Sequence, residues 1–303
     1  MVFFWYLASK ETGMSEFVIG IDGGGTSCRA AIADRSGKIL GSARAGAANI
    51  LSDPDGALSN VVLASLSAIS DAGLDVELKD VAAVLGLAGA NIDDTARSFE
   101  KRLPFCKSLV ETDGYIALHG AFAGGDGIAA ILGTGSVYIT SHEGKVTYTG
   151  GWGFRVGDLG AGARLGQALL QECLLVYDGI HRGTSLTKAV LESFSGDPTR
   201  ITAFAHKAVP GDFGRYAPQI FKAAEEGDTI AVAILRQAAS YVDEALDVAL
   251  ATGENRICLL GGLAPFYPAW LAGRHQVRLV EAKGDALSGA VSLAVSSFVG
   301  EVQ

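Results

Sequence analysis

The chain has 303 residues, with 24 Lys and Arg against 33 Asp and Glu, so its formal net charge is −9. That length allows one large domain or two medium ones. An acidic balance with no basic run argues against a surface that neutralises phosphate backbones or an anionic membrane, so we expect neither nucleic acid nor membrane as a partner. Glycine accounts for 40 residues, roughly twice the usual share of about 7%. Backbone without side chains is therefore needed at several places.

The start of the chain and the cysteines indicate the compartment in which the protein functions. The apolar residues 1–8 fall well short of the roughly 18 that span a bilayer, and no positively charged segment precedes them. We expect residues 1–14 to be a disordered leader, with Met14 as the working start, because the strand pattern begins at Phe17. The cysteines show no CxxC spacing, which favours reduced thiols in a cytoplasmic protein; they are Cys28, Cys106, Cys173 and Cys258.

The first half of the chain opens with a strand, a glycine turn and a returning strand. The strands are expected at 17–22 and 28–34, and the turn between them is Asp22-Gly23-Gly24-Gly25-Thr26. Further strands are expected at 39–44, 81–87 and 108–111, and helices at 95–102 and 115–122. A helix that opens at Asp53-Pro54 should carry Leu58, Val62, Leu66 and Ile69 on its inner face.

The opening pattern returns in the second half. Strands are expected at 128–132, 137–141 and 146–149, with Gly133-Thr134-Gly135-Ser136 at the first turn. Helices at 163–177, 185–194 and 228–251, a strand at 256–260 and a last helix at 285–297 follow. The repetition predicts an internal duplication. No Pro/Ser-rich linker separates the halves, so we expect two tightly joined domains with a cleft between them.

The loop after the first strand has the composition of a phosphate site. Three glycines and Thr26 bring backbone N–H groups together without side chains in the way. The carboxylate of Asp22 would face the same space and could hold Mg²⁺, which prefers oxygen ligands. An ordinary Asp-Gly hairpin is an even alternative for this loop alone. The matching loop at 133–136 shifts the balance towards phosphate, because two such loops can clamp a phosphate chain.

Other polar positions are ambiguous from the residues alone. Asp113 is either a helix N-cap or a general base that accepts the proton of a substrate hydroxyl, and Asp158 has a similar ambiguity. Trp152 is either core packing or the apolar wall beneath a sugar ring. Gly261-Gly262 is either a tight turn or a surface for a flat ligand. The histidines have no metal-binding spacing with each other and are treated as structural or surface residues; they are His119, His142, His181, His206 and His275.

Taken in order, the motifs resemble the BadF/BadG-type ATPase and N-acetylglucosamine kinase family, of the sugar kinase, actin and Hsp70 superfamily. They are Asp22-Gly23-Gly24-Gly25-Thr26, Leu87-Ala88-Gly89-Ala90, Thr112-Asp113, Gly133-Thr134-Gly135-Ser136 and the stretch from Gly150 to Asp158. The bacterial N-acetylglucosamine and glucosamine kinases look most similar. The resemblance implies an α/β fold of two actin-like, ribonuclease H-like domains with a duplicated βββαβαβα core. We expect residues 15–113 plus 285–303 in one domain and residues 114–284 in the other.

The resemblance also implies roles for individual residues. Asp22 would organise Mg²⁺, and Asp113 would be the base at the 6-hydroxyl of an amino sugar. Residues expected to contact ATP are Gly23, Gly24, Gly25, Thr26, Thr134, Gly135, Gly261, Gly262 and Ser288. Residues expected to line the sugar site are Asn49, Gly89, Asp113, Ser136, Gly151, Trp152 and Asp158. The implied substrates are ATP and either N-acetylglucosamine, the first choice, or glucosamine. A homodimer is the default assembly.

Two other functions compete with the kinase. Some BadF-type ATPases activate acyl-CoA dehydratases through a shared iron–sulfur cluster, which requires exposed and suitably placed cysteine thiolates. A sugar-sensing regulator would need a DNA-binding segment and a basic face. We rank the kinase first, the activator second and the regulator third.

Overall fold

The computed structural model describes residues 16–90 and 94–299. These form two compact units, one that ends at residue 125 and takes in the chain again from 282, and one built from residues 126–281. From the sequence we expected the first domain to end at residue 113. In the structure the first unit continues to residue 125 and includes the helix that begins at Asp113. The expected leader at 1–14, and Asn91, lie outside the described residues.

The first unit contains a five-stranded sheet in the order β3-β2-β1-β4-β5. β1 pairs antiparallel with β2 and parallel with β4, and β4 pairs parallel with β5. The strands span β1 (Phe17–Gly23), β2 (Cys28–Asp34), β3 (Ile39–Ala45), β4 (Ala82–Leu87) and β5 (Lys107–Thr112). The helices are α2 (Pro54–Asp71), η2 (Leu78–Asp80), α3 (Thr95–Glu100), α4 (Asp113–Phe122) and α12 (Ala286–Phe298).

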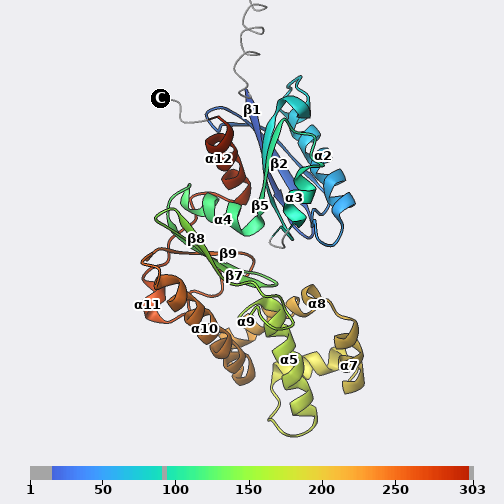
Figure 1. The fold of residues 1–303 in the computed structure, drawn as a ribbon. Helices are drawn as coiled ribbons and strands as arrows, with labels where there is room; N and C mark the ends of the chain where they lie inside the picture. The colour runs from blue at the N-terminus through green and yellow to red at the C-terminus, as the bar shows by residue number, and fades with distance from the viewer. Residues whose placement is uncertain (1–15, 91–93, 300–303) are drawn as a thin grey trace, which may run out of the picture. The chain divides into compact units, whose positions relative to one another are not determined.

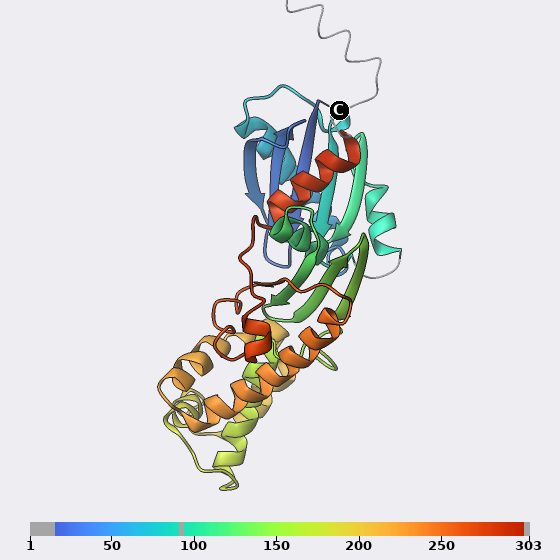
Figure 2. The ribbon, with the colours of Figure 1, turned by 90° about the vertical axis from the view of Figure 1, so that its left-hand side faces the viewer.

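Alternation along the strands of this sheet produces two cores. Ile19 and Ile21 of β1 face α2, whereas Val18 faces α12 and α4. Figures 1 and 2 show α2 and α12 on opposite faces of the sheet. The last helix of the chain therefore covers a face of the sheet that the first residues build.

The inner face of α2 differs from the expected one. Leu66 is 48% exposed, and Leu58 and Val62 are half-buried, so of the expected leucine-rich stripe only Ile69 is fully buried. The helix instead lies on the sheet through a row of mostly small side chains at helical spacing, which lets it approach closely. These are Ala57, Val61, Ala64, Ser65 and Ala68.

The second unit contains a four-stranded sheet in the order β8-β7-β6-β9. Its strands are β6 (Gly127–Leu132), β7 (Ser136–His142), β8 (Lys145–Gly150) and β9 (Ile257–Leu260). β6 pairs antiparallel with β7 and parallel with β9. The place of a fifth strand is taken by an isolated parallel bridge between Ile257 and Leu279. The expected duplication is therefore present, with a shortened second copy.

Helices form the rest of the second unit. They are α5 (Gly162–Tyr177), α6 (Ser185–Ser193), α7 (Pro198–Lys207), α8 (Pro210–Gly214), α9 (Ala217–Glu225), α10 (Thr229–Leu250) and α11 (Gly273–Gln276). The sequence predicted α5, α6 and α10 but none of the others. Ile128, Leu132 and Tyr138 of the sheet pack with the helical core of α5 and α10. Among residues 16–90 and 94–299, no helix is both long and apolar enough to cross a membrane.

Candidate active site

The carboxyl ends of three parallel strands carry the candidate site of the first unit. In the sheet register, Gly23 of β1 lies beside Leu87 of β4, and Leu87 lies beside Thr112 of β5. Asp22, Gly89 and Asp113 therefore come to one edge of the sheet. This is the edge at which open α/β sheets bind ligands.

The glycine loop after β1 is partly open and partly packed. A side chain on Gly23 would meet Leu87 and Ala48, so this glycine is required by packing. Around Gly25 there is no atom within 4 Å of where a side chain would begin, and Gly25 and Thr26 are exposed. The tip of the loop therefore has the bare, accessible backbone that a phosphate group needs.

Asp22 is held by Arg29, a residue that the sequence analysis did not select. The two are directly opposite each other in the β1–β2 ladder, and the Nε and a terminal nitrogen of Arg29 donate to Oδ2 of Asp22 at 3.1 and 2.7 Å. The other terminal nitrogen donates to Oδ2 of Asp285 at 2.7 Å. Asp285 caps α12 by accepting from the backbone of Ser288. Arg29 thus connects the candidate metal ligand to the last helix of the chain.

Asp113 is the first residue of α4, and the N-cap is Thr112, whose hydroxyl accepts from the amide of Tyr115. The N-cap alternative for Asp113 is therefore wrong. Its Oδ1 accepts from the amide of Gly114 at 2.9 Å. Asp113 reaches solvent, but the protein around it withdraws the carboxylate from water and raises its pKa. The Gly114 hydrogen bond opposes this, and the Asp22 carboxylate raises the pKa further.

Asn49 and Gly89 lie together beside this edge. Asn49 forms an isolated parallel bridge with Ala88, the residue before Gly89. A side chain on Gly89 would meet Leu51 and Oδ1 of Asn49. The same Oδ1 accepts from the amides of Leu51 and Ser52 at 3.0 and 3.1 Å. The side-chain oxygen of Asn49 therefore organises its own loop.

The loop from Gly133 to Ser136 is the candidate phosphate loop of the second unit. Its Thr134 is exposed, whereas Ser136 is 6% exposed and its hydroxyl donates to the carbonyl of Leu159 at 3.1 Å. A side chain on Gly135 would collide with Oδ2 of Asp158. Asp158 and the loop are thus neighbours, and the Ser136 hydroxyl supports the loop from inside.

The glycine-rich stretch after β8 folds back over the same loop. The amide of Gly151 donates to the carbonyl of Ser136 at 3.0 Å, and the amide of Gly153 donates to Oδ1 of Asp158 at 3.1 Å. Burial is the main cause of the raised pKa of Asp158, and backbone hydrogen bonds from Gly153 and Ser136 oppose the rise. Trp152 is 79% exposed, which excludes the core-packing alternative and leaves an open apolar surface.

Gly261-Gly262 follows β9 at the edge of the sheet where β6 also ends. Gly261 has φ +88°, and a side chain there would fall on the carbonyl of Leu132, so the tight-turn interpretation explains this glycine. Nothing lies within 4 Å of a side chain at Gly262, which is exposed. Ser288, expected near the same ligand, lies in the first unit, where its hydroxyl donates to the carbonyl of Asp285 at 2.7 Å.

The residues around Asp22 fit a magnesium ion held mainly by water and phosphate. Arg29 occupies Oδ2 of Asp22, and the described residues place Asp22 in no cluster of three metal-binding side chains. A single carboxylate oxygen together with waters and substrate phosphates is a usual arrangement for Mg²⁺.

The cysteines do not support an iron–sulfur centre. Cys28, Cys173 and Cys258 are buried, and only Cys106 is exposed. Burial is the main cause that raises the pKa of Cys28 and Cys173 to about 12. Ligation of iron needs thiolates within reach of one cluster, which these separate buried thiols do not offer.

Comparison with known proteins identifies relatives over most of the chain. Residues 19–278 match the BadF/BadG/BcrA/BcrD ATPase family. The glucosamine kinase GspK of Vibrio cholerae is 38% identical over 280 residues, 92% of this chain and 95% of that protein. The N-acetyl-D-glucosamine kinase of Dictyostelium discoideum is 26% identical over 243 residues, 74% and 76% of the two proteins.

The fold is also similar to that of a solved structure. A proposed N-acetylglucosamine kinase from Chromobacterium violaceum has a TM-score of 0.84 at 35% identity, with 92% of this chain and 99% of that one covered. The expected two-domain, actin-like ATPase fold is thereby confirmed.

Proposed function

The chain belongs to the BadF/BadG/BcrA/BcrD ATPase family, and we propose that it is an ATP-dependent amino-sugar kinase. It would transfer the γ-phosphoryl group of ATP to the 6-hydroxyl of N-acetylglucosamine or glucosamine. The observation that supports this most is the meeting of Asp22 and Asp113 at the carboxyl edge of the first sheet, in a chain 38% identical to a glucosamine kinase along nearly its whole length.

Asp113 is the proposed general base. A sugar hydroxyl is a weak nucleophile, but phosphoryl transfer needs mainly alignment and neutralisation of charge. The oxygen of the 6-hydroxyl bonds to the γ-phosphorus, the bond from phosphorus to the β–γ bridging oxygen breaks, and the hydroxyl proton passes to the Asp113 carboxylate. A raised pKa makes that carboxylate a better proton acceptor, provided that it is still ionised at the working pH.

We assign contacts with ATP in each unit by itself. In the first unit these are the open tip of the loop at Gly24, Gly25 and Thr26, and in the second unit the exposed Thr134 and Gly262. Mg²⁺ held by Asp22 would neutralise charge on the phosphates. Arg29 would keep the Asp22 carboxylate in place through its two donated hydrogen bonds.

The residues proposed to bind the sugar are taken from each unit by itself. We assign Asn49 and Gly89 from the first unit, and Gly151, Trp152 and Asp158 from the second. The exposed face of Trp152 suits the apolar face of a sugar ring. The hydroxyl of Ser136 donates to the carbonyl of Leu159, so towards the sugar it would act as a hydrogen-bond acceptor.

The preferred amino sugar is the finer part of the proposal, and the relatives divide over it. We retain N-acetylglucosamine as the first choice and glucosamine as the alternative. Glucosamine carries an ammonium group at C2 near neutral pH and N-acetylglucosamine does not, so the two differ in charge at one position.

An assay of ADP release tests both parts. Purified protein with MgATP is given N-acetylglucosamine, glucosamine, glucose, N-acetylmannosamine or no sugar. We expect turnover with one or both of the first two and little with the others. ATP hydrolysis that no sugar alters would overturn the kinase proposal, and turnover restricted to glucosamine would reverse the order of the two amino sugars.

A further inference from the structure

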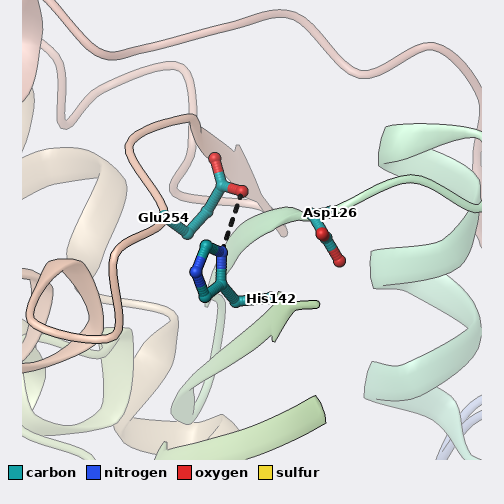
Figure 3. A group of neighbouring side chains, drawn as sticks. All are labelled: Asp126, His142 and Glu254. Atoms are coloured by element: carbon teal, nitrogen blue, oxygen red, sulfur yellow. Dashed lines mark ion pairs between the residues drawn. The ribbon is translucent and has the colours of Figure 1, made fainter. Parts of the chain in front are cut away.

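Three metal-binding side chains meet at the end of the second sheet away from the candidate active site. Asp126 directly precedes β6, His142 is the last residue of β7, and Glu254 lies just before β9. Because β6 runs parallel to β9 and antiparallel to β7, these positions share one edge. Figure 3 shows the three side chains together. We call Asp126, His142 and Glu254 the strand-end triad.

The donor atoms of the strand-end triad converge without bonding to one another. One ligand atom from each residue lies within 4.8 Å of the others. Nδ1 of His142 and Oε2 of Glu254 are 4.0 Å apart, too far for a hydrogen bond. That nitrogen is buried and has no hydrogen-bond partner among the described residues. An unpaired buried donor or acceptor is costly unless something binds it.

Glu254 is the buried carboxylate of the strand-end triad. Its side chain is only 7% exposed. Oε1 accepts from the amides of Asn255 and Arg256, both at 2.9 Å, and from the Arg256 side chain at 3.3 Å. Oε2 points towards His142 and lies 4.0 Å from its Nδ1 (Figure 3). The carboxylate is thus fixed through one oxygen and presents the other.

Hydrogen bonds hold Asp126, and close packing confines the ring of His142. Asp126 accepts from the hydroxyl of Ser141 at 2.7 Å and from the amide of Glu143 at 2.9 Å, and each of its oxygens keeps a second lone pair. The His142 ring lies against Gly253, where a side chain would come within 2.9 Å of Nε2. Such outer contacts orient the ligands of natural metal sites.

We propose that the strand-end triad binds a divalent transition metal of the Zn²⁺ class. One imidazole nitrogen and two carboxylates form a donor set that Zn²⁺ accepts, with water in a remaining position. Arg256 is the neighbouring cation, and its guanidinium contacts Oε1 of Glu254 and the carbonyl of Asp126. Two carboxylates and one guanidinium leave one negative charge to attract the ion.

The bound ion would hold strand ends together rather than take part in phosphoryl transfer. β6 has six residues, so about 20 Å of strand separates this edge from the loop at Gly133. The ion would join the start of β6 to its two neighbours in the sheet, β7 and β9.

Titration with Zn²⁺ tests the proposal. Protein in a Cys106→Ser background, which removes the one exposed thiol, is stripped with EDTA and titrated by calorimetry. We expect one equivalent to bind with a rise in Tm. His142→Gln should weaken binding at least tenfold and abolish the rise in Tm. Co²⁺ should give a d–d absorption spectrum that His142→Gln removes.

The matched control is His206→Gln, which changes an exposed histidine of α7 in the same unit and should bind Zn²⁺ as the parent does. Both variants should keep the parent's sugar-dependent turnover, so a failed metal site and a failed kinase proposal are distinguishable. Absence of Zn²⁺ binding, or equal binding and equal Tm shifts in His142→Gln and the parent, would overturn the site.

Discussion

Asp113 combines a favourable position for catalysis with an unfavourable environment for its charge. It stands at the start of α4, where the helix dipole favours a negative group, yet withdrawal from water and the Asp22 carboxylate both raise its pKa. A general base benefits from such an environment, whereas folding does not. The two effects can be measured separately in one variant.

Asp113→Asn should lower kcat by about 100-fold or more, the usual contribution of a general base. The amide keeps the shape and the oxygen that accepts from Gly114, so the KM for ATP should change little. Steady-state ADP release measures both constants. Asp75→Asn, the same exchange at an exposed position of the same unit, is the control. A kcat within a few-fold of the parent would contradict the assignment of Asp113 as the base.

The same variant should not lose stability at neutral pH. A carboxyl whose pKa is raised by folding stabilises the protein below its unfolded value, 3.8, and this contribution is lost as pH rises through the folded value. Asp113→Asn should therefore match or exceed the parent in Tm at pH 7, and its advantage should shrink as pH falls. Thermal melts across this pH range test the sign. Because Asp113 reaches solvent, the difference should be small.

Arg29 is the residue of the candidate site that pattern reading missed. Its role depends on strand register, because the pairing of β1 with β2 puts it opposite Asp22. A planar guanidinium donates twice to Asp22 and once to Asp285 from a fixed fork, which the point-like ammonium of lysine does not reproduce.

Arg29→Lys should raise the KM for MgATP by about tenfold, the equivalent of one charge-assisted hydrogen bond. Initial rates at varied MgATP and saturating sugar measure the change. Arg44 is an exposed arginine directly opposite Arg29 on β3, so Arg44→Lys is the matched control and should behave as the parent. Equal KM values in both variants would show that Arg29 does not hold Asp22 for ATP.

At the scale of elements, the contact between α4 and α12 positions both Asp113 and Asp285. The two helices approach so closely that a side chain on Gly289 would fall on the carbonyl of Ile116 and lie 2.6 Å from the amide of Gly120. These are backbone atoms, which cannot rotate away as a side chain can. The close approach therefore depends on glycine at this position.

Gly289→Ala should force the helices apart and destabilise the protein by about 1–3 kcal/mol, the usual cost of overpacking. It should also lower kcat, because α4 carries Asp113 at its first residue. Denaturant unfolding and ADP release measure the two effects. Gly211→Ala is the control, since nothing lies within 4 Å of a side chain there. Parent-like stability in Gly289→Ala would mean that the helices can separate without cost.

Strong patterns in the sequence predicted most elements, and weak ones did not. The alternating strand at 28–34 has the predicted bounds, and α10 lies within one residue of its prediction at both ends. The helices α7, α8 and α9 span only 10, 5 and 9 residues, which is shorter than the window of about 11 to 18 residues over which a helical period is read. Proline in the first turn of each was the available signal.

The candidate site could be predicted where it depends on residues adjacent in the chain. It could not be predicted where it depends on how separate strands pair. Asp22 lies near the end of β1, and Asp113 and the glycine loops come at the ends of other strands, so their place at strand ends could be read from the chain. The pairing of Arg29 with Asp22, and the meeting of Asp126, His142 and Glu254, arise from the register of separate strands. The sequence determines that register through burial and turn geometry, but the patterns read from one chain did not reveal it.

At the scale of the whole molecule, the two units differ in how the chain builds them. The second is one continuous segment, residues 126–281, whereas the first needs the chain to return at residue 282. The returning segment supplies α12, and Ala290, Val291 and Ala294 of that helix pack with Val18 and Val84 of the sheet. Without α12, the part of that face that α4 does not cover would be exposed to water.

The two units should consequently behave differently as fragments. Residues 126–281 retain their whole core and should unfold cooperatively alone, as measured by circular dichroism. Residues 16–125 lack α12 and should be aggregated or unfolded, because an exposed apolar sheet face of this kind associates. Adding a peptide of residues 282–303 should restore a cooperative transition to this fragment. A cooperative transition in residues 16–125 alone would mean that α12 only covers a sheet that is already stable, and the link from Arg29 to Asp285 would then serve the site rather than the fold.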